Sequence, residues 1–138
     1  MKKHIENCIF CKIIKGEIPS YKVYEDENTY VFFDINPINE YHALVIPKSH
    51  YKDIFDVPEN EALHIMKTIK TIVNIYNEQL GIKNVQIINN SGAEAQQDVF
   101  HIHFHIVPRL NGDGQNLGLK RHPELQSKLN DLLSKLNC

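Results

Sequence analysis

The sequence predicts an α+β fold, a five-stranded antiparallel sheet with one long helix and short helices towards the two ends of the chain. Two observations predict it. Runs of β-branched and aromatic residues follow one another with short turns between them, which is typical of hairpin-connected strands. A single longer segment repeats apolar residues at helical spacing, so helices lie to the side of the strands rather than alternating with them. The 138 residues carry no repeat and no linker-like tract, so one domain over residues 1–138 is expected.

The first half of the chain predicts a short helix and three strands. The apolar positions of residues 8–15 fit a short helix, and Gly16 provides its end. Strand-like runs follow at residues 21–25, 29–35 and 42–46. Asp26, Glu27 and Asn28 between the first two runs predict a hairpin turn.

The second half begins with the clearest helix, predicted from about Pro58 to Leu80. Asp56 as N-cap, the early Pro58 and Glu59 resemble a capping box, and Gly81 is a good C-terminal stop. The expected core-facing stripe comprises Ala62, Ile65, Met66, Ile69, Ile72, Val73, Tyr76 and Leu80.

Two strands and a last helix complete the predicted order of elements. The strands are expected at residues 84–89 and 99–107, and Pro108 ends the second of them. The helix is expected at about 123–136. The leucines that this helix is expected to bury are Leu125, Leu129, Leu132, Leu133 and Leu136.

Charge, hydropathy and cysteine usage exclude several classes of protein. Fifteen Lys and Arg oppose 17 Asp and Glu, so nothing favours non-specific nucleic-acid binding. No run approaches the ~18 apolar residues of a membrane span, and no apolar region follows the basic start Met1-Lys2-Lys3, so no secretory signal is expected. Three cysteines, an odd number, include a C-x-x-C pair, which indicates a reducing compartment and a cytoplasmic protein.

Three of the eight histidines alternate along one predicted strand, at His101, His103 and His105. Because a strand turns successive side chains to opposite faces, the imidazoles face one way and the intervening apolar residues face the other, where they can pack under the long helix. Three interpretations are open: surface histidines, a metal site in which all three are ligands, or catalysis by an imidazole that titrates near neutral pH.

A polar segment precedes this strand and favours the catalytic interpretation. It contains Asn89-Asn90-Ser91-Gly92 and Gln96-Gln97-Asp98, with amides, a hydroxyl and a flexible glycine. Amide donors beside imidazoles suit a phosphate or another oxyanion. A polar turn between two strands explains the Asn and Gly residues equally well.

The run His101-Ile102-His103-Phe104-His105-Ile106-Val107 resembles the motif of the histidine triad (HIT) family. The resemblance covers most of the chain and is closest to the Hint-like bacterial branch. It implies a HIT-like fold, a single HIT domain, and a nucleotide-binding hydrolase or transferase. Substrates of that family are nucleoside phosphoramidates, aminoacyl-adenylates or dinucleoside polyphosphates. The further blocks that carry the resemblance are residues 8–14, 33–35, 42–50 and the Asn90-x-Gly92 pair.

The resemblance also implies roles for individual residues. His103 would attack the α-phosphorus of a purine nucleotide (AMP- or GMP-like) and form a nucleotidyl-histidine that water hydrolyses, with no cofactor required for catalysis. His42 and His101 would support the nucleophile. The phosphate donors would be His105, Asn90, Gln97 and the backbone near Val99. The nucleoside pocket would comprise Phe10, Ile13, Phe33, Asp34 and Ile35, with the Asp34 carboxylate on the ribose.

A structural zinc ion and a homodimer are two more implications of the resemblance. Cys8 and Cys11, with His50 and His101, would form a closed Cys₂His₂ zinc site. Reduced thiols or a redox pair are the alternatives for the two cysteines. Family members commonly pair through the long helix and a strand, so a homodimer is expected, with neither nucleic acid nor membrane as a partner.

Two positions depart from the family pattern. Gln96 stands where a glycine is usual, and Asp98 stands where a serine is frequent. A carboxylate repels a bound phosphate unless it faces away, so the preferred leaving group is open. Dinucleoside polyphosphate hydrolysis and a low-turnover nucleotide sensor are the alternatives to phosphoramidate cleavage.

Overall fold

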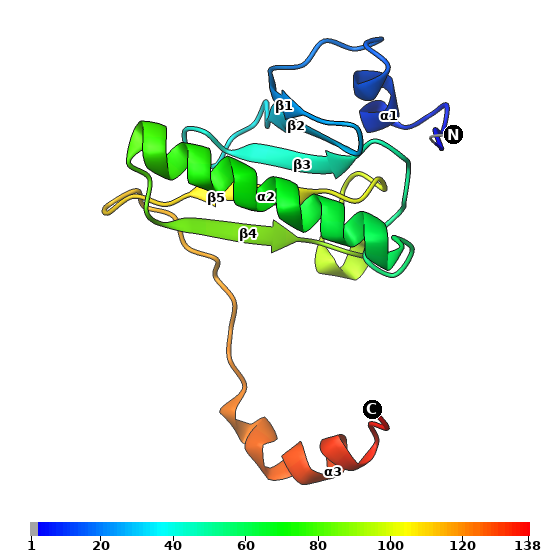
Figure 1. The fold of residues 1–138 in the computed structure, drawn as a ribbon. Coiled ribbons are helices and arrows are strands. Elements are labelled where there is room, and N and C mark those ends of the chain that lie inside the picture. The colour runs from blue at the N-terminus through cyan, green and yellow to red at the C-terminus, as the bar shows by residue number, and fades with distance from the viewer. Residues whose placement is uncertain (1–2) are drawn as a thin grey trace.

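A computed structural model describes residues 3–138; Met1 and Lys2, part of the basic start considered above, lie outside the described residues. Five strands form one sheet in the order β1-β2-β3-β5-β4, and every neighbouring pair is antiparallel, as predicted (Figure 1). The strands are β1 (Lys22–Glu25), β2 (Thr29–Phe33), β3 (Ala43–Pro47), β4 (Val85–Asn89) and β5 (Phe104–Pro108). Among residues 3–138 no helix is both long and apolar enough to cross a membrane.

Two helices cover opposite faces of this sheet. The long helix α2 (Glu59–Leu80) lies across one face, where Ile65, Ile69 and Ile72 pack on alternate residues of β2, β3 and β5 (Figure 1). The short helix α1 (Ile9–Ile14) packs on the other face, against residues such as Phe32 and Leu44. Both faces of β3 are therefore buried, which explains its unbroken apolar run.

Strand β5 begins five residues later than the predicted strand 99–107. Its pairing with β3 and β4 starts at Phe104, and His101 and His103 precede the ladder. The backbone N–H of Ile102 donates instead to the Tyr51 carbonyl, and the Asn89 side chain donates to the His103 carbonyl. The predicted alternation holds for the paired part, because Phe104 and Ile106 face α2 while His105 pairs with Leu44 on the α1 face.

The ends of α2 agree with the prediction only in part. Gly81 ends the helix in the left-handed conformation, with φ of 69°, as expected. The predicted Asp56 cap is wrong: Pro58 is the N-cap, without a side-chain bond, because the Asp56 carboxylate accepts a hydrogen bond from the Lys52 N–H. Met66 and Leu80 of the predicted stripe are largely exposed.

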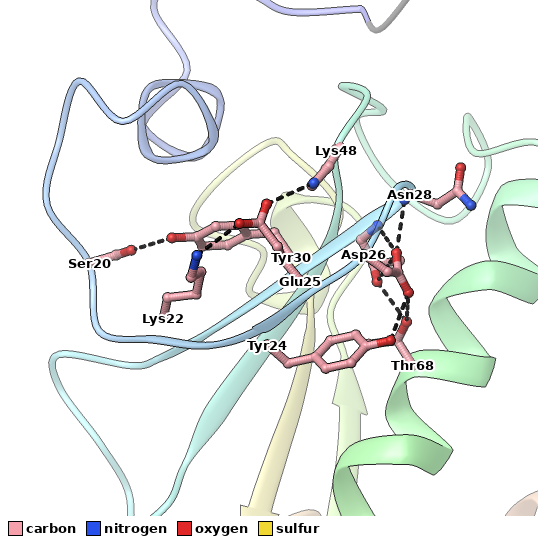
Figure 2. A network of polar contacts seen from close by, with 10 residues as sticks. Ser20, Lys22, Tyr24, Glu25, Asp26, Asn28, Tyr30, Lys48 and Thr68 are labelled. Carbon is pink, nitrogen blue, oxygen red and sulfur yellow. Dashed lines mark hydrogen bonds and ion pairs between the residues drawn. The ribbon is translucent and has the colours of Figure 1, made fainter.

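A polar network joins the β1–β2 turn to α2 (Figure 2). The Asp26 carboxylate accepts hydrogen bonds from the backbone of Asn28 and from the Thr68 hydroxyl of α2. Burial raises the pKa of Asp26, but the donors around it outweigh burial and hold that pKa below its ordinary value. The predicted turn is thereby fixed against the helix.

The C-terminal segment contradicts the predicted buried helix. Residues 123–136 form a 3₁₀ turn, η2 (Pro123–Lys128), followed by the short α3 (Leu129–Ser134). This segment extends away from the sheet, because the connection after β5 carries it clear of both covered faces (Figure 1). The five leucines are therefore exposed: Leu125 44%, Leu129 57%, Leu132 46%, Leu133 68% and Leu136 66%.

Candidate active site and metal centre

His103 lies on the α1 face of the sheet, with one ring nitrogen bonded to a backbone carbonyl. Its side chain is buried, and its Nδ1 lies 2.8 Å from the His101 carbonyl oxygen. A carbonyl only accepts, so Nδ1 carries a proton, and the neutral form of the ring has its lone pair on Nε2. The Phe10 ring packs edge-on at 5.2 Å between centroids and limits rotation of the imidazole. An imidazole held in this tautomer is a neutral nucleophile with a fixed direction.

His105 is held in the opposite tautomer by a relay that starts in the backbone. The Ile38 N–H donates to His42 Nδ1 at 3.0 Å, so the proton of His42 is on Nε2. His42 Nε2 in turn lies 2.9 Å from His105 Nδ1 and donates to it. The remaining proton of His105 is therefore on Nε2, which makes this atom a hydrogen-bond donor.

Burial keeps both members of this relay neutral. It lowers the pKa of His42, against the opposing charge of Asp34, and it lowers the pKa of His105 to about 4. The rings of His103 and His105 are 5.2 Å apart between centroids. A lone-pair nitrogen and an N–H donor on adjacent rings can attack a phosphorus atom and hold one of its oxygens.

The predicted nucleoside residues divide between a cavity and the core. Phe33, Asp34 and Ile35 line a cavity of about 450 Å³ together with His42. Phe10 and Ile13 are buried in the α1-face core, although Phe10 also touches the His103 ring. Asp34 Oδ2 is 3.6 Å from His42 Nε2, so the carboxylate is close to the histidine relay.

The predicted phosphate donors are only partly available in this arrangement. The Gln97 side chain donates to the carbonyls of Lys52 and Val99 and accepts from the Gly92 N–H, so it holds the loop together. Asn90 lines a second cavity of about 450 Å³ that also includes His105. Gln96, where a glycine was expected, adopts a positive φ of 69°, a conformation that costs most side chains energy.

Asp98 lies directly beside the nucleophile. Its Oδ1 is 3.6 Å from His103 Nε2 and accepts a hydrogen bond of 2.8 Å from the Val99 N–H. The Val99 N–H, expected as a phosphate donor, is thus bound by a carboxylate here. The Asp98 side chain as a whole is 81% exposed, so it is free to turn.

The four predicted metal ligands converge in a buried cluster at the start of α1. Cys8 Sγ is 3.4 Å from His101 Nδ1, and Cys11 Sγ is 3.6 Å from the same atom. Cys11 Sγ is also 3.5 Å from His50 Nδ1. All the ligand atoms lie within 4.8 Å of one another, so the cluster could hold a metal ion.

The protonation state of this cluster suits a metal. His101 Nε2 donates to the Pro47 carbonyl at 2.9 Å, which leaves the Nδ1 lone pair facing the thiols. Burial lowers the pKa of His101 to about 4 and also lowers that of His50, so both rings are neutral. Burial raises the pKa of the Cys11 thiol, while the Ile5 N–H bond to its sulfur opposes this.

In a second group of potential ligands, Asp34, His42 and His105, two of the imidazole nitrogens are bonded to each other. His42 Nε2 carries the proton that it donates to His105 Nδ1, so these two nitrogens share a hydrogen bond. The ligand atoms of His103 join neither cluster among the described residues. The arrangement therefore does not support the interpretation of His101, His103 and His105 as three ligands of one metal.

Several groups that position the site left little signal in the sequence. The Ile38 N–H and the Pro47 and His101 carbonyls set the tautomers of His42, His101 and His103, and backbone groups carry no residue signature. Asn89 belongs to the polar segment singled out above, but its bond to the His103 carbonyl depends on the β4–β5 pairing.

The family model of the HIT domain matches residues 15–112. An uncharacterized HIT-like protein of Methanocaldococcus jannaschii is 49% identical over 78% of this chain and 83% of its own length. The adenosine 5′-monophosphoramidase of Candida albicans is 37% identical over 94% of this chain and 89% of its own length. The adenylylsulfatase of Arabidopsis thaliana is 35% identical over 93% of this chain and 66% of its own length.

Solved structures match the fold as well. A protein of Streptococcus mutans superposes with a TM-score of 0.88 and 35% identity, covering 97% of this chain and 85% of that one. A zinc-bound histidine triad family protein of Mycobacterium smegmatis has a TM-score of 0.76 and 36% identity, and the match covers 94% of this chain and 98% of that one.

Proposed function

We propose that this chain, which belongs to the histidine triad (HIT) family, cleaves the α-phosphate bond of purine nucleoside phosphoramidates or related adenylates through a nucleotidyl-histidine on His103. Relatives named for hydrolysis of adenosine phosphoramidate and of adenylyl sulfate support a nucleotide hydrolase in general. The observation that carries the finer proposal is the pair of opposite tautomers at His103 and His105.

In the first step His103 Nε2 attacks the α-phosphorus, the bond from phosphorus to the leaving group breaks, and that group departs with the electron pair. The N–H of His105 donates to a phosphate oxygen as negative charge accumulates there, and the relay through His42 keeps that donor in place. In the second step water attacks phosphorus and the bond to Nε2 breaks, which releases the nucleoside monophosphate. The Asp34 carboxylate lines the cavity beside His42 and is the proposed acceptor for the ribose hydroxyls.

We propose that the Cys8, Cys11, His50 and His101 cluster binds a structural zinc ion. Tetrahedral zinc with Zn–S bonds of about 2.3 Å and Zn–N bonds of about 2.0–2.1 Å places sulfur and nitrogen about 3.6 Å apart. The sulfur–nitrogen distances in the cluster, 3.4–3.6 Å, agree with this value. Such an ion would tie α1 to the loops before β5, and all four of its positions would be filled by the protein.

We also propose that residues 1–138 act as one unit that forms a homodimer in the cytoplasm. The exposed leucines of the C-terminal segment belong to neither hydrophobic core cluster of the described residues, and they offer a surface for a second copy. The three free cysteines agree with a reducing compartment.

The test is to incubate the zinc-loaded protein with adenosine phosphoramidate, follow AMP release, and measure intact mass after a rapid acid quench. We expect AMP release and a transient adenylyl adduct, both lost in His103→Ala. The matched control is His122→Ala, an exposed histidine of the C-terminal segment, which should retain both. AMP binding without turnover or adduct would contradict the hydrolase and favour a nucleotide sensor.

A further inference from the structure

Asp98 places a negative charge at the point where bonds are made and broken. Its carboxylate oxygen is 3.6 Å from His103 Nε2, the atom proposed to attack phosphorus. The bond from the Val99 N–H holds the carboxylate on this side of the loop. Because the side chain is exposed, it can also turn without a steric barrier from the core.

This charge repels some parts of the substrate and attracts others. Nonbridging phosphate oxygens are negative and require donors, so the carboxylate must leave the Val99 N–H when a phosphate approaches it. The group on the far side of phosphorus from Nε2 is the leaving group. A carboxylate turned towards it is favourable if that group carries N–H bonds or positive charge, and unfavourable if it is an anion.

A groove with room for a leaving group adjoins Asp98. Asp98 lines a groove of about 590 Å³ together with Val99, Phe100 and Ile9, which supply apolar walls. The groove is also lined by Lys3, Lys52 and Asp56, so its two positive and two negative side chains balance. Of these charged groups, Asp98 is the one that lies 3.6 Å from the nucleophilic nitrogen of His103.

We propose that Asp98 selects for amine leaving groups and against anionic ones such as sulfate and phosphate; this inference rests on the proposed function of His103. In the favoured reaction the lone pair of Nε2 forms the bond to phosphorus and the P–N bond breaks. The leaving nitrogen first takes a proton from solvent water and becomes positive; the electron pair of the P–N bond then goes to this nitrogen, which leaves as a neutral amine. The carboxylate accepts a hydrogen bond from the nitrogen while it is positive.

With an anionic leaving group the carboxylate of Asp98 makes the same step less favourable. In adenosine 5′-phosphosulfate a P–O bond breaks and sulfate takes the electron pair, so negative charge grows beside Asp98. The exposure of Asp98 weakens the repulsion through solvent screening. We expect the remaining discrimination to be about tenfold in kcat/KM.

The experiment compares kcat/KM for adenosine phosphoramidate and adenosine 5′-phosphosulfate in the full-length wild type and in Asp98→Asn. The quantity of interest is the change in the ratio of the two values, because the intrinsic reactivities of the substrates cancel. We expect Asp98→Asn to reduce the preference for the phosphoramidate about tenfold, mainly by improving cleavage of the phosphosulfate. Glu94→Gln removes one charge from the same loop, on an exposed residue, and should leave the ratio unchanged.

The outcomes separate the two proposals. If both substrates are cleaved and Asp98→Asn leaves their ratio within twofold of the wild type, the role of Asp98 is overturned and the function of His103 stands. The same holds if Glu94→Gln changes the ratio as much as Asp98→Asn does. If the wild type cleaves neither substrate and forms no adenylyl adduct, the proposed function fails and the selection by Asp98 fails with it.

Discussion

His42 Nε2 and His105 Nδ1 are 2.9 Å apart, and the direction of that hydrogen bond is set by the Ile38 N–H on the other side of His42. A backbone group thereby determines which nitrogen of His105 carries a proton. The relationship joins two residues 63 positions apart, on segments that meet only because β3 pairs with β5.

The first prediction concerns this relay. His42→Leu removes the donor to His105, so the ring is free to adopt the wrong tautomer, and we expect kcat to fall about ten- to a hundredfold. His42→Gln offers an amide N–H at a similar distance and should recover part of the loss. Steady-state kinetics on adenosine phosphoramidate measure both. Equal activity of the Leu variant and the wild type would contradict the relay.

The second prediction concerns the metal cluster. Cys8→Ser removes a thiolate ligand, and we expect loss of equimolar zinc together with several kcal/mol of stability. Elemental analysis and thermal unfolding measure the two effects. Cys138→Ser is the matched control, because that cysteine is exposed and outside the cluster. Zinc retained at full occupancy in Cys8→Ser would disprove the assigned ligands.

The third prediction concerns acid stability. The pKa of His105 is about 4 in the folded protein and near its ordinary value of 6.5 when unfolded, so between these values the unfolded state binds more protons. Stability from this residue is complete above pH 6.5 and is lost as pH falls towards 4. Allowing for the partial exposure of the ring, we expect a loss of about 1–2 kcal/mol.

Urea unfolding of zinc-loaded protein between pH 7 and pH 4 measures this loss. His105→Asn keeps an acceptor for His42 but does not titrate, so its stability should depend less steeply on pH than that of the wild type. His122→Asn, at an exposed site, should follow the wild type. Identical slopes for wild type and His105→Asn would show that the depressed pKa does not contribute.

The fourth prediction concerns the C-terminal segment. Leu129 and Leu133 lie one turn apart on α3 and are both exposed. A fully buried leucine contributes about 1.5–3 kcal/mol, so replacing both with Ser should weaken the proposed dimer at least about tenfold. Sedimentation over a concentration series measures the equilibrium, with Asn130→Ser as control. A wild type that remains monomeric would refute the dimer.

Local patterns predicted most of the strands, because a strand needs only a run of suitable residues and a turn. The observed ends of strands and helices differ from the predicted ones where another part of the chain forms a competing hydrogen bond. Strand β5 starts at Phe104 because the Asn89 side chain and the Tyr51 carbonyl take the bonds that a longer ladder would use. The predicted Asp56 cap failed in the same way, through a competing bond to the Lys52 N–H.

The sequence by itself indicated the candidate residues of the site, the long helix and the likeness to a family, because motif spacing and periodicity are local properties. The tertiary structure decided which nitrogen of each histidine carries a proton, since that depends on acceptors such as the Pro47 carbonyl, 54 residues from His101. It also decided that the leucines of α3 are exposed, because burial requires a surface to pack against and the chain leads that helix away from the sheet. The type of a residue limits the chemistry that its side chain can perform, and the contacts around the side chain decide its protonation state and its exposure.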